Sequence, residues 1–231
     1  MKTIEQIRNE ARDILGNKWR VRSAHDVPSI KDLTLNGNEA AEFEGTVLYA
    51  DMDGSTDMVR GYKNWFAAEM YKIYLQTVSE VIRNEGGAIT AYDGDRVMAI
   101  FEGGAKNTTA ARTGMKIVFA IRELNGIIAK HYPNTQFRLK HNIGVDTSML
   151  FAVRAGVRGA NDIVWVGEAA NVAAKLTSVN DENYPLYITK KVFDSLNNSV
   201  VESNTGKMMW QQVDELKFGR QVYRTNWCWN F

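Results

Sequence analysis

Two segments of the sequence place carboxylates at the ends of expected strands. Residues 47–58, VLYADMDGSTDM, begin with apolar residues typical of a buried strand and continue into Asp51 and Asp53. Residues 91–101, AYDGDRVMAIF, contain the Asp-Gly pair typical of a β-hairpin turn, and Asp95 follows that turn directly. If these strands are neighbours in one sheet, Asp51 and Asp95 lie close together, and each raises the pKa of the other unless a cation lies between them.

Such a carboxylate pair has the oxygen ligands that Mg²⁺ and Mn²⁺ prefer, and these ions keep positions for water and substrate phosphates. Gly54, Ser55 and Thr56 follow the first acids and lead into a helix, whose free N–H groups can bind an anion. The combination predicts a metal–triphosphate site. Taken singly, the same residues would only cap the helix and shape the turn.

The elements that must position these acids alternate along the chain. Their order of strand, helix, hairpin, helix and strand predicts a single α+β domain with a ferredoxin-like β-α-β-β-α-β core and a small C-terminal strand and hairpin addition. The expected elements are a strand over 45–52, a helix over 57–84, a hairpin over 88–101, a helix with Asn107 as its N-cap, strands in FRLKHNIGVD and DIVWVG, a helix over 168–179, a strand and helix over 186–196 and a hairpin region over 208–227.

The first 44 residues read as an N-terminal helix and arm, followed by the main domain over 45–231. Within residues 1–16 apolar side chains recur at helical spacing, and residues 17–44 are polar and rich in turn formers. We expect the helix to dock on its own domain, with contact to a second copy as the alternative. The apolar positions of this helix are Ile4, Ile7, Ala11 and Ile14.

Composition narrows the class of protein. The net charge is +1 and no run of five Lys or Arg residues occurs, which argues against nucleic-acid or membrane binding driven by charge. No apolar stretch approaches the length of a membrane span. Cys228 is the only cysteine, which excludes an intramolecular disulfide and indicates a reducing compartment. We therefore expect a cytoplasmic globular protein.

The motifs resemble those of class III nucleotide cyclases. TVLYADMDGSTDMV resembles their first strand, AYDGDRVMAIF their metal-binding hairpin, and VRAGVRGA with WVGEAANVAAKL their ribose- and phosphate-binding turn and helix. The resemblance covers about residues 45–196, with the four motifs in order. More narrowly, the short chain is similar to the pyrimidine cyclases of Pycsar anti-phage systems. This implies a cyclase that makes a second messenger, which a separate effector senses.

The resemblance also implies roles for individual residues. Two divalent cations, Mn²⁺ or Mg²⁺, would be held by Asp51 and Asp95 with the carbonyl of Met52. Backbone amides of residues 54–56 would bind the terminal phosphates.

The ribose and the reacting phosphate have their own matches in the resemblance. Asn171 matches the residue that orients the ribose. Lys175 stands where the family has an arginine, so the charge remains without the bidentate fork. Lys217 resembles a lysine that binds the terminal phosphate, although a surface lysine is an equal interpretation. Because the family divides these groups between two subunits, the resemblance implies a homodimer with active sites at the interface.

The residues that would contact the base do not match purine-specific relatives. Ala91 and Val164 occupy the two positions that read a purine, and neither can hydrogen-bond a base edge. Tyr49, Asp162 and Arg96 are the polar or bulky candidates nearby. Tyr49 could equally be a core aromatic residue, and Arg96 could equally form a surface ion pair.

This pattern argues against ordinary adenylate or guanylate specificity. The resemblance then favours a pyrimidine, UTP slightly over CTP. The alternatives are an adenylate cyclase with an atypical base pocket and a catalytically inactive domain that only binds nucleotide.

Overall fold

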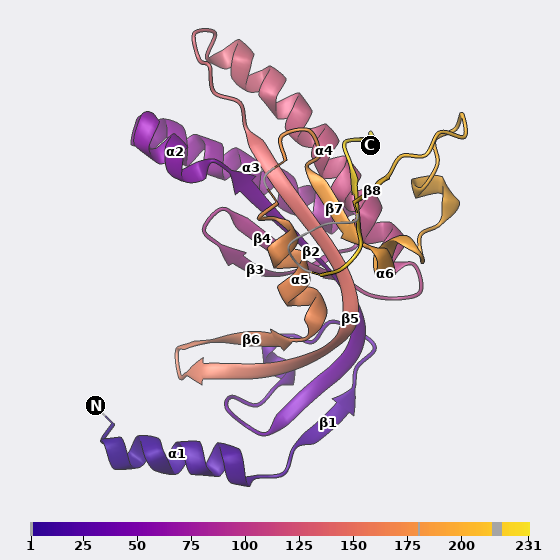
Figure 1. Cartoon of the computed structure of the whole chain (residues 1–231). Coiled ribbons are helices and arrows are strands. Elements are labelled where there is room, and N and C mark those ends of the chain that lie inside the picture. Colours follow the sequence, from indigo (N-terminus) through magenta and orange to yellow (C-terminus); the bar gives the residue numbers. More distant parts are fainter. Residues whose placement is uncertain (1, 180, 214–218) are drawn as a thin grey trace.

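One sheet organises the residues that the structure, a computed structural model, describes: 2–179, 181–213 and 219–231. The strands within these ranges are β1 (Arg20–Ser23), β2 (Glu39–Asp53), β3 (Ala88–Asp93), β4 (Arg96–Phe101), β5 (Lys140–Val157), β6 (Ala160–Val166), β7 (Leu186–Thr189), β8 (Gln211–Val213) and β9 (Val222–Thr225). They lie in the order β3-β4-β2-β5-β7-β9-β8, with β1 added to β2 and β6 added to β5 (Figure 1). The part β3-β4-β2-β5 has the order of a ferredoxin-like core, as predicted.

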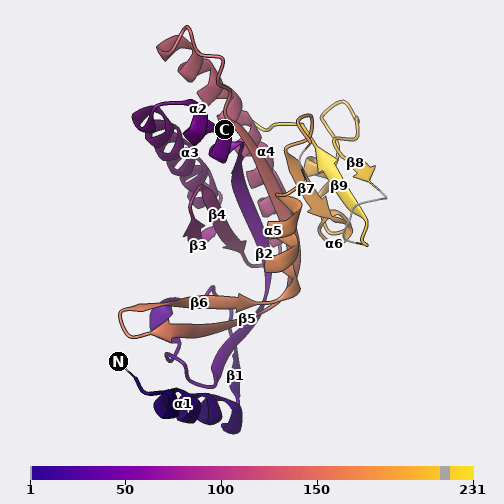
Figure 2. The same cartoon turned by 60° about the vertical axis from the view of Figure 1, so that its left-hand side comes forward.

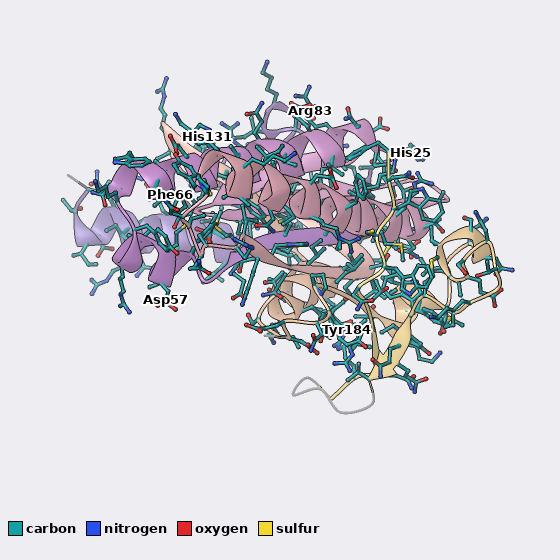
Figure 3. All side chains as sticks on the ribbon, turned by 90° about the horizontal axis from the view of Figure 1, so that it is seen from above. His25, Asp57, Phe66, Arg83, His131 and Tyr184 are labelled. Atoms are coloured by element: carbon teal, nitrogen blue, oxygen red, sulfur yellow. The ribbon has the colours of Figure 1, made fainter. Side chains whose placement is uncertain are left out.

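Helices connect these strands and cover both faces of the sheet. The helices in the described residues are α1 (Ile4–Gly16), α2 (Ser55–Gly61), α3 (Asn64–Asn84), α4 (Lys106–His131), α5 (Glu168–Leu176) and α6 (Lys190–Phe193), with 3₁₀ turns η1 (Ile30–Asp32) and η2 (Asn198–Val200). Seen from above, α3 and α4 lie side by side on one side of the strands, with Phe66 and His131 at the same end (Figure 3). None of these helices is both long and apolar enough to cross a lipid bilayer.

The alternation of side chains along β2 separates two apolar clusters. Leu48 and Ala50 are buried in the larger cluster, which α3 and α4 cover. Val47 is buried on the opposite face, in a smaller cluster with residues of α5. Tyr49 packs at the edge of that smaller cluster. Because residues two apart in a strand share one face, Asp51 lies on the same α5 face of β2.

An arm projects from this body. It consists of β1, the first half of β2, the last half of β5 and β6, and α1 lies at its end (Figure 2). All residues of α1 are exposed on their own chain, so the expected docking of this helix on its own domain is wrong. The predicted strand begins at residue 45, but β2 begins at Glu39. The segment 39–44 is part of the strand because it pairs with β1 and β5.

Two further local predictions are corrected by the structure. The helix predicted over 57–84 is divided, because the chain is extended at Tyr62 and Lys63 between α2 and α3. Asn107 is not the N-cap of α4, whose N-cap is Ala105. Instead, the Asn107 side chain accepts a hydrogen bond from the Thr46 hydroxyl at 2.5 Å, which ties α4 to β2.

Candidate active site

Pairing between β2 and β4 brings the two predicted acids together. Asp51 lies opposite Arg96 in the antiparallel register, and Asp95 directly precedes Arg96 in the turn. Gly94 makes this turn possible with a φ of +62°, a conformation that favours glycine. A hairpin that the sequence predicted therefore sets Asp95 beside the end of β2.

At Asp51, burial and the neighbouring acids act against Arg96. Burial raises the pKa of the Asp51 carboxyl, the negative charges of Asp95 and Asp53 raise it further, and Arg96 lowers it. The Arg96 Nη2 donates a hydrogen bond to Asp51 Oδ2 at 3.0 Å. Arg96 is the one cation that lowers the pKa of Asp51, against two neighbouring carboxylates that raise it, which leaves a surplus of negative charge around this group.

The donor set fits a divalent cation held by oxygen. The described residues contain no group of three or more His, Cys, Asp or Glu side chains placed to hold a metal, so backbone oxygens, water or substrate must complete any coordination shell. A buried donor beside the acids, Arg96 Nε, has no hydrogen-bond partner among these residues. An unused donor next to clustered carboxylates fits acceptor oxygens that arrive with a metal and its ligands.

The chain leaves β2 through a turn that exposes backbone amides. Gly54 is the N-cap of α2 with a φ of +72°, and no side chain caps this helix start. Ser55 and Thr56 form the first turn, with Thr56 exposed. The Met52 side chain is buried in the core on the α3–α4 side, so only its backbone could serve the site.

A row of side chains lies beside the acids on the α5 face of the sheet. Tyr49 pairs with Met98 on β4, and Met98 pairs with Ala91 on β3, so the three share one face. The Arg96 guanidinium carbon lies 6.0 Å from the centre of the Tyr49 ring. The structure therefore brings Tyr49, Ala91 and Arg96 into one neighbourhood with Asp51.

The other predicted residues lie elsewhere on the chain. Val164 pairs with Val153 of β5, and Asp51 pairs with Asn142 of the same strand, eleven residues away. That separation corresponds to roughly 36 Å of extended strand. Figures 1 and 2 show β6 on the projecting arm, at the opposite end of the molecule from α2. Asp162 is also exposed on β6, so neither β6 residue joins the acids within one chain.

The helix α5 presents two of the predicted residues to solvent. Asn171 and Lys175 are both exposed and lie four residues apart, on one side of α5. The helix packs so closely on β5 that a side chain at Gly144 would meet the Ala173 carbonyl oxygen at 2.1 Å. Lys217 lies outside the described residues.

Residues that the sequence interpretation missed link β5 to the start of α5. Asp146, nearly fully buried on β5, accepts a hydrogen bond from the Thr189 hydroxyl at 2.5 Å. Arg220 lies 4.0 Å from Asp146 and forms an ion pair with Glu168, the first residue of α5. No local pattern marks Asp146, because it is one of several polar residues in the strand sequence KHNIGVDTSML.

Comparisons with known proteins agree with this geometry. No family model matches the sequence. The chain is 49% identical to a uridylate cyclase of Xanthomonas perforans, over 94% of each chain, and 47% identical to a uridylate cyclase of Burkholderia cepacia, over 92% of each. Its fold resembles the crystal structure of the adenylyl cyclase CyaB from P. aeruginosa, with a TM-score of 0.66 and 18% identity, covering 81% of this chain and 95% of that one. The chain therefore belongs to the same family as these uridylate cyclases, and it has the fold of the adenylyl cyclase CyaB.

Proposed function

We propose that this nucleotide cyclase is a metal-dependent uridylate cyclase, which converts UTP to 3′,5′-cyclic UMP and pyrophosphate. The observation that carries the proposal is the register that sets Asp51 beside the turn of Asp95 and Arg96, in a chain 49% identical to a uridylate cyclase. The same register supports metal dependence, because it gathers carboxylates without enough cations from the protein to balance them.

The reaction is an internal phosphoryl transfer. The 3′-hydroxyl oxygen attacks the α-phosphorus of the same nucleotide and forms the new P–O bond. The bond from the α-phosphorus to the bridging oxygen breaks, and pyrophosphate leaves with that electron pair, while the hydroxyl proton passes to solvent. Two Mn²⁺ or Mg²⁺ ions, when bound, lower the pKa of the attacking hydroxyl and offset charge on the triphosphate.

Residues at the end of β2 bind and orient the reacting groups. Asp51 and Asp95 would hold the cations, with the backbone carbonyl of Met52 as a further ligand. The exposed backbone amides of residues 54–56 would donate hydrogen bonds to the terminal phosphate oxygens. These roles are supported by the exposed turn at Gly54 and by the acids that meet beside it.

Side chains on the α5 face of the sheet favour a base with one ring over a purine. The Tyr49 ring lies between the acids and the apolar cluster and would narrow the pocket beside Ala91, where a purine would need more space. Arg96 offers only hydrogen-bond donors, which suit the two carbonyl oxygens of uracil better than the single carbonyl of cytosine. These features favour UTP, with CTP as the second candidate.

A homodimer would complete the site. Asn171 and Lys175 on α5, and Asp162 and Val164 on β6, would come from the partner subunit to bind ribose, phosphate and base. The distance of β6 from Asp51 within one chain supports this division. In a two-fold dimer, each subunit would give its acids to one site and its helix α5 to the other.

Incubation of the protein with each of the four ribonucleoside triphosphates and Mn²⁺ tests the proposal. We expect cyclic UMP as the main product, identified by mass spectrometry. Cyclic AMP alone would point to an adenylate cyclase with an atypical pocket, and bound nucleotide without any product would point to an inactive nucleotide-binding domain. By its family resemblance, we further propose that the product acts in the cytoplasm as a messenger of phage infection to a separate effector.

A further inference from the structure

Asp146 is an acid in the interior of the sheet. It is 2% exposed on β5 and lies opposite Val47 of β2, so its side chain is on the α5 face that buries Val47. Burial raises the pKa of this carboxyl, whereas hydrogen bonds from the Thr189 hydroxyl and the Thr147 backbone lower it, and so does the charge of Arg220. A buried ion pair often gives no more stability than packed apolar side chains would, so stability alone does not account for this acid.

Arg220 connects the buried acid to the surface of α5. Its Nη1 lies 4.0 Å from Asp146 Oδ2, and its Nη2 donates a hydrogen bond to Glu168 Oε1 at 2.5 Å. Arg220 stands two residues before Val222, which pairs with Thr189 of β7. The guanidinium therefore comes from the β7–β9 part of the sheet and reaches the first residue of α5.

Glu168 lies on the same side of α5 as the two residues that would serve the substrate. Glu168, Asn171 and Lys175 are exposed and separated by three and four residues, which is the spacing of side chains on one helix face. The buried side of the same first turn is held separately, because the Ala169 N–H donates a hydrogen bond to the Ser148 hydroxyl at 3.0 Å. The start of α5 is thus held at two points, and the ion pair with Arg220 is the one on the exposed face.

This ion pair fixes orientation more than it adds stability. The Glu168 side chain is 64% exposed, and pairs with an exposed partner contribute little to the free energy of unfolding. We propose that Arg220 is a positioning residue of α5. By joining Glu168 to the buried Asp146, it sets the orientation of the helix in which its two proposed substrate-binding side chains face the nucleotide. The inference rests on the proposed cyclase function and on the proposed division of the site between subunits.

Steady-state kinetics of cyclic UMP formation separate this role from direct contact with the substrate. Arg220→Met keeps a long side chain and removes its charge. A misplaced α5 should lower kcat roughly ten- to a hundredfold, because small displacements of positioning groups are costly to the reaction. The KM for UTP with Mn²⁺ should stay within about twofold of wild type, because the acids that would hold the metal and triphosphate are unchanged. A raised KM at unchanged kcat would make Arg220 a substrate-binding residue and overturn the positioning role.

Two further variants act on the same ion pair. Arg220→Lys keeps the charge without the planar fork and should recover part of the lost kcat. Glu168→Gln should lower kcat as Arg220→Met does, and the double variant should lower it no further, because both changes break one interaction. Since Glu168 is exposed, this variant leaves no buried charge unpaired and tests the inference even if Arg220→Met does not fold. An unchanged kcat in Glu168→Gln overturns the inference.

Arg224→Met is the matched control for the loss of an ion pair. Arg224 lies on β9 and pairs with Asp181 at 2.5 Å, away from the first turn of α5. We expect this variant to keep the wild-type kcat, whatever stability it loses. Equal losses of kcat in Arg220→Met and Arg224→Met would assign both to a general loss of stability and overturn the inference.

Mixed dimers show which half of the site the change affects. Arg220→Met mixed with Asp51→Ala should regain about a quarter of the wild-type activity, because each heterodimer has one site with neither defect. Arg220→Met mixed with Asn171→Ala should regain none, because both changes affect the same half. Asp51→Ala mixed with Asn171→Ala is the reference, and if it recovers, recovery of Arg220→Met by Asn171→Ala or by neither variant overturns the inference. Absence of cyclic UMP from the wild type overturns the proposed function itself, whereas normal turnover in all Arg220 and Glu168 variants overturns only this inference.

Discussion

Two inactive variants of the chain should restore activity when mixed, if the site is divided between subunits. Asp51→Ala removes a proposed metal ligand and leaves the side chains of α5 unchanged. Asn171→Ala removes the side chain of α5 that would orient the ribose and leaves the acids unchanged. The residues lie on different parts of one chain, with Asp51 at the end of β2 and Asn171 exposed on α5. A dimer of one copy of each variant has one site with both defects and one site with none.

The expected recovery follows from the two-fold symmetry. Equal amounts of the two variants, after full exchange of subunits, give heterodimers as half of all dimers. Each heterodimer carries one intact site of its two, so the mixture regains about a quarter of the wild-type activity. Each variant alone should remain close to zero, because every site of its homodimer has the same defect.

Formation of cyclic product, measured by mass spectrometry at several mixing ratios, checks this expectation, and recovery should be greatest at equal amounts. A mixture of Asp51→Ala with Asp95→Ala is the control, because both acids belong to the same half of the site and no intact site can form. Absence of recovery, while native mass spectrometry shows exchanged subunits, would refute the division. Wild-type turnover in Asp51→Ala alone would refute the role of that acid.

Two further perturbations test the packing behind the site. Burial lowers the pKa of His141 from 6.5 to about 4, so its contribution to stability is present above pH 6.5 and is lost as the pH falls toward 4. Urea unfolding should therefore show a loss of about 3 kcal/mol in the free energy of unfolding between these pH values. His141→Gln should reduce this loss, whereas His131→Gln, at an exposed histidine, should leave it unchanged. Gly144→Ala should lower the free energy of unfolding by roughly 1–3 kcal/mol and reduce cyclase activity, because its Cβ would displace α5. In the control Gly126→Ala, the added Cβ meets nothing within 4 Å, so neither the stability nor the activity should fall.

The half of the site that holds the acids could be predicted because its geometry is local. An Asp-Gly turn fixes the hairpin, and pairing of its second strand with β2 then fixes Asp95 beside Asp51. The same reasoning missed the break at Tyr62, where the chain becomes extended between two helices that share one apolar pattern. Periodicity records the buried face of a helix but not a short interruption in its backbone.

Features set by tertiary contacts left no comparable signal. Asn107 has the side chain of a good N-cap, yet as the second residue of α4 it accepts a hydrogen bond from Thr46 on β2. Tyr74 fits the apolar face of α3 in the sequence, and only the structure shows that its hydroxyl is fully buried without a partner among the described residues. The roles of Asn171 and Lys175 stay predictions, because in the proposed dimer the residues they would serve belong to another copy of the chain.

The charges at the end of β2 indicate that this region is built for binding rather than for stability. Asp51 is partly buried, and burial together with Asp53 and Asp95 disfavours its ionised form, while Arg96 provides one compensating hydrogen bond. A protein that needed only to fold would gain from an apolar residue at this strand end, since clustered carboxylates and unpaired donors destabilise it. A divalent cation would reverse this balance, because it adds two positive charges and brings oxygen acceptors for the unused donor. The cost to stability is therefore confined to the place where the proposed reaction needs a cation and a triphosphate.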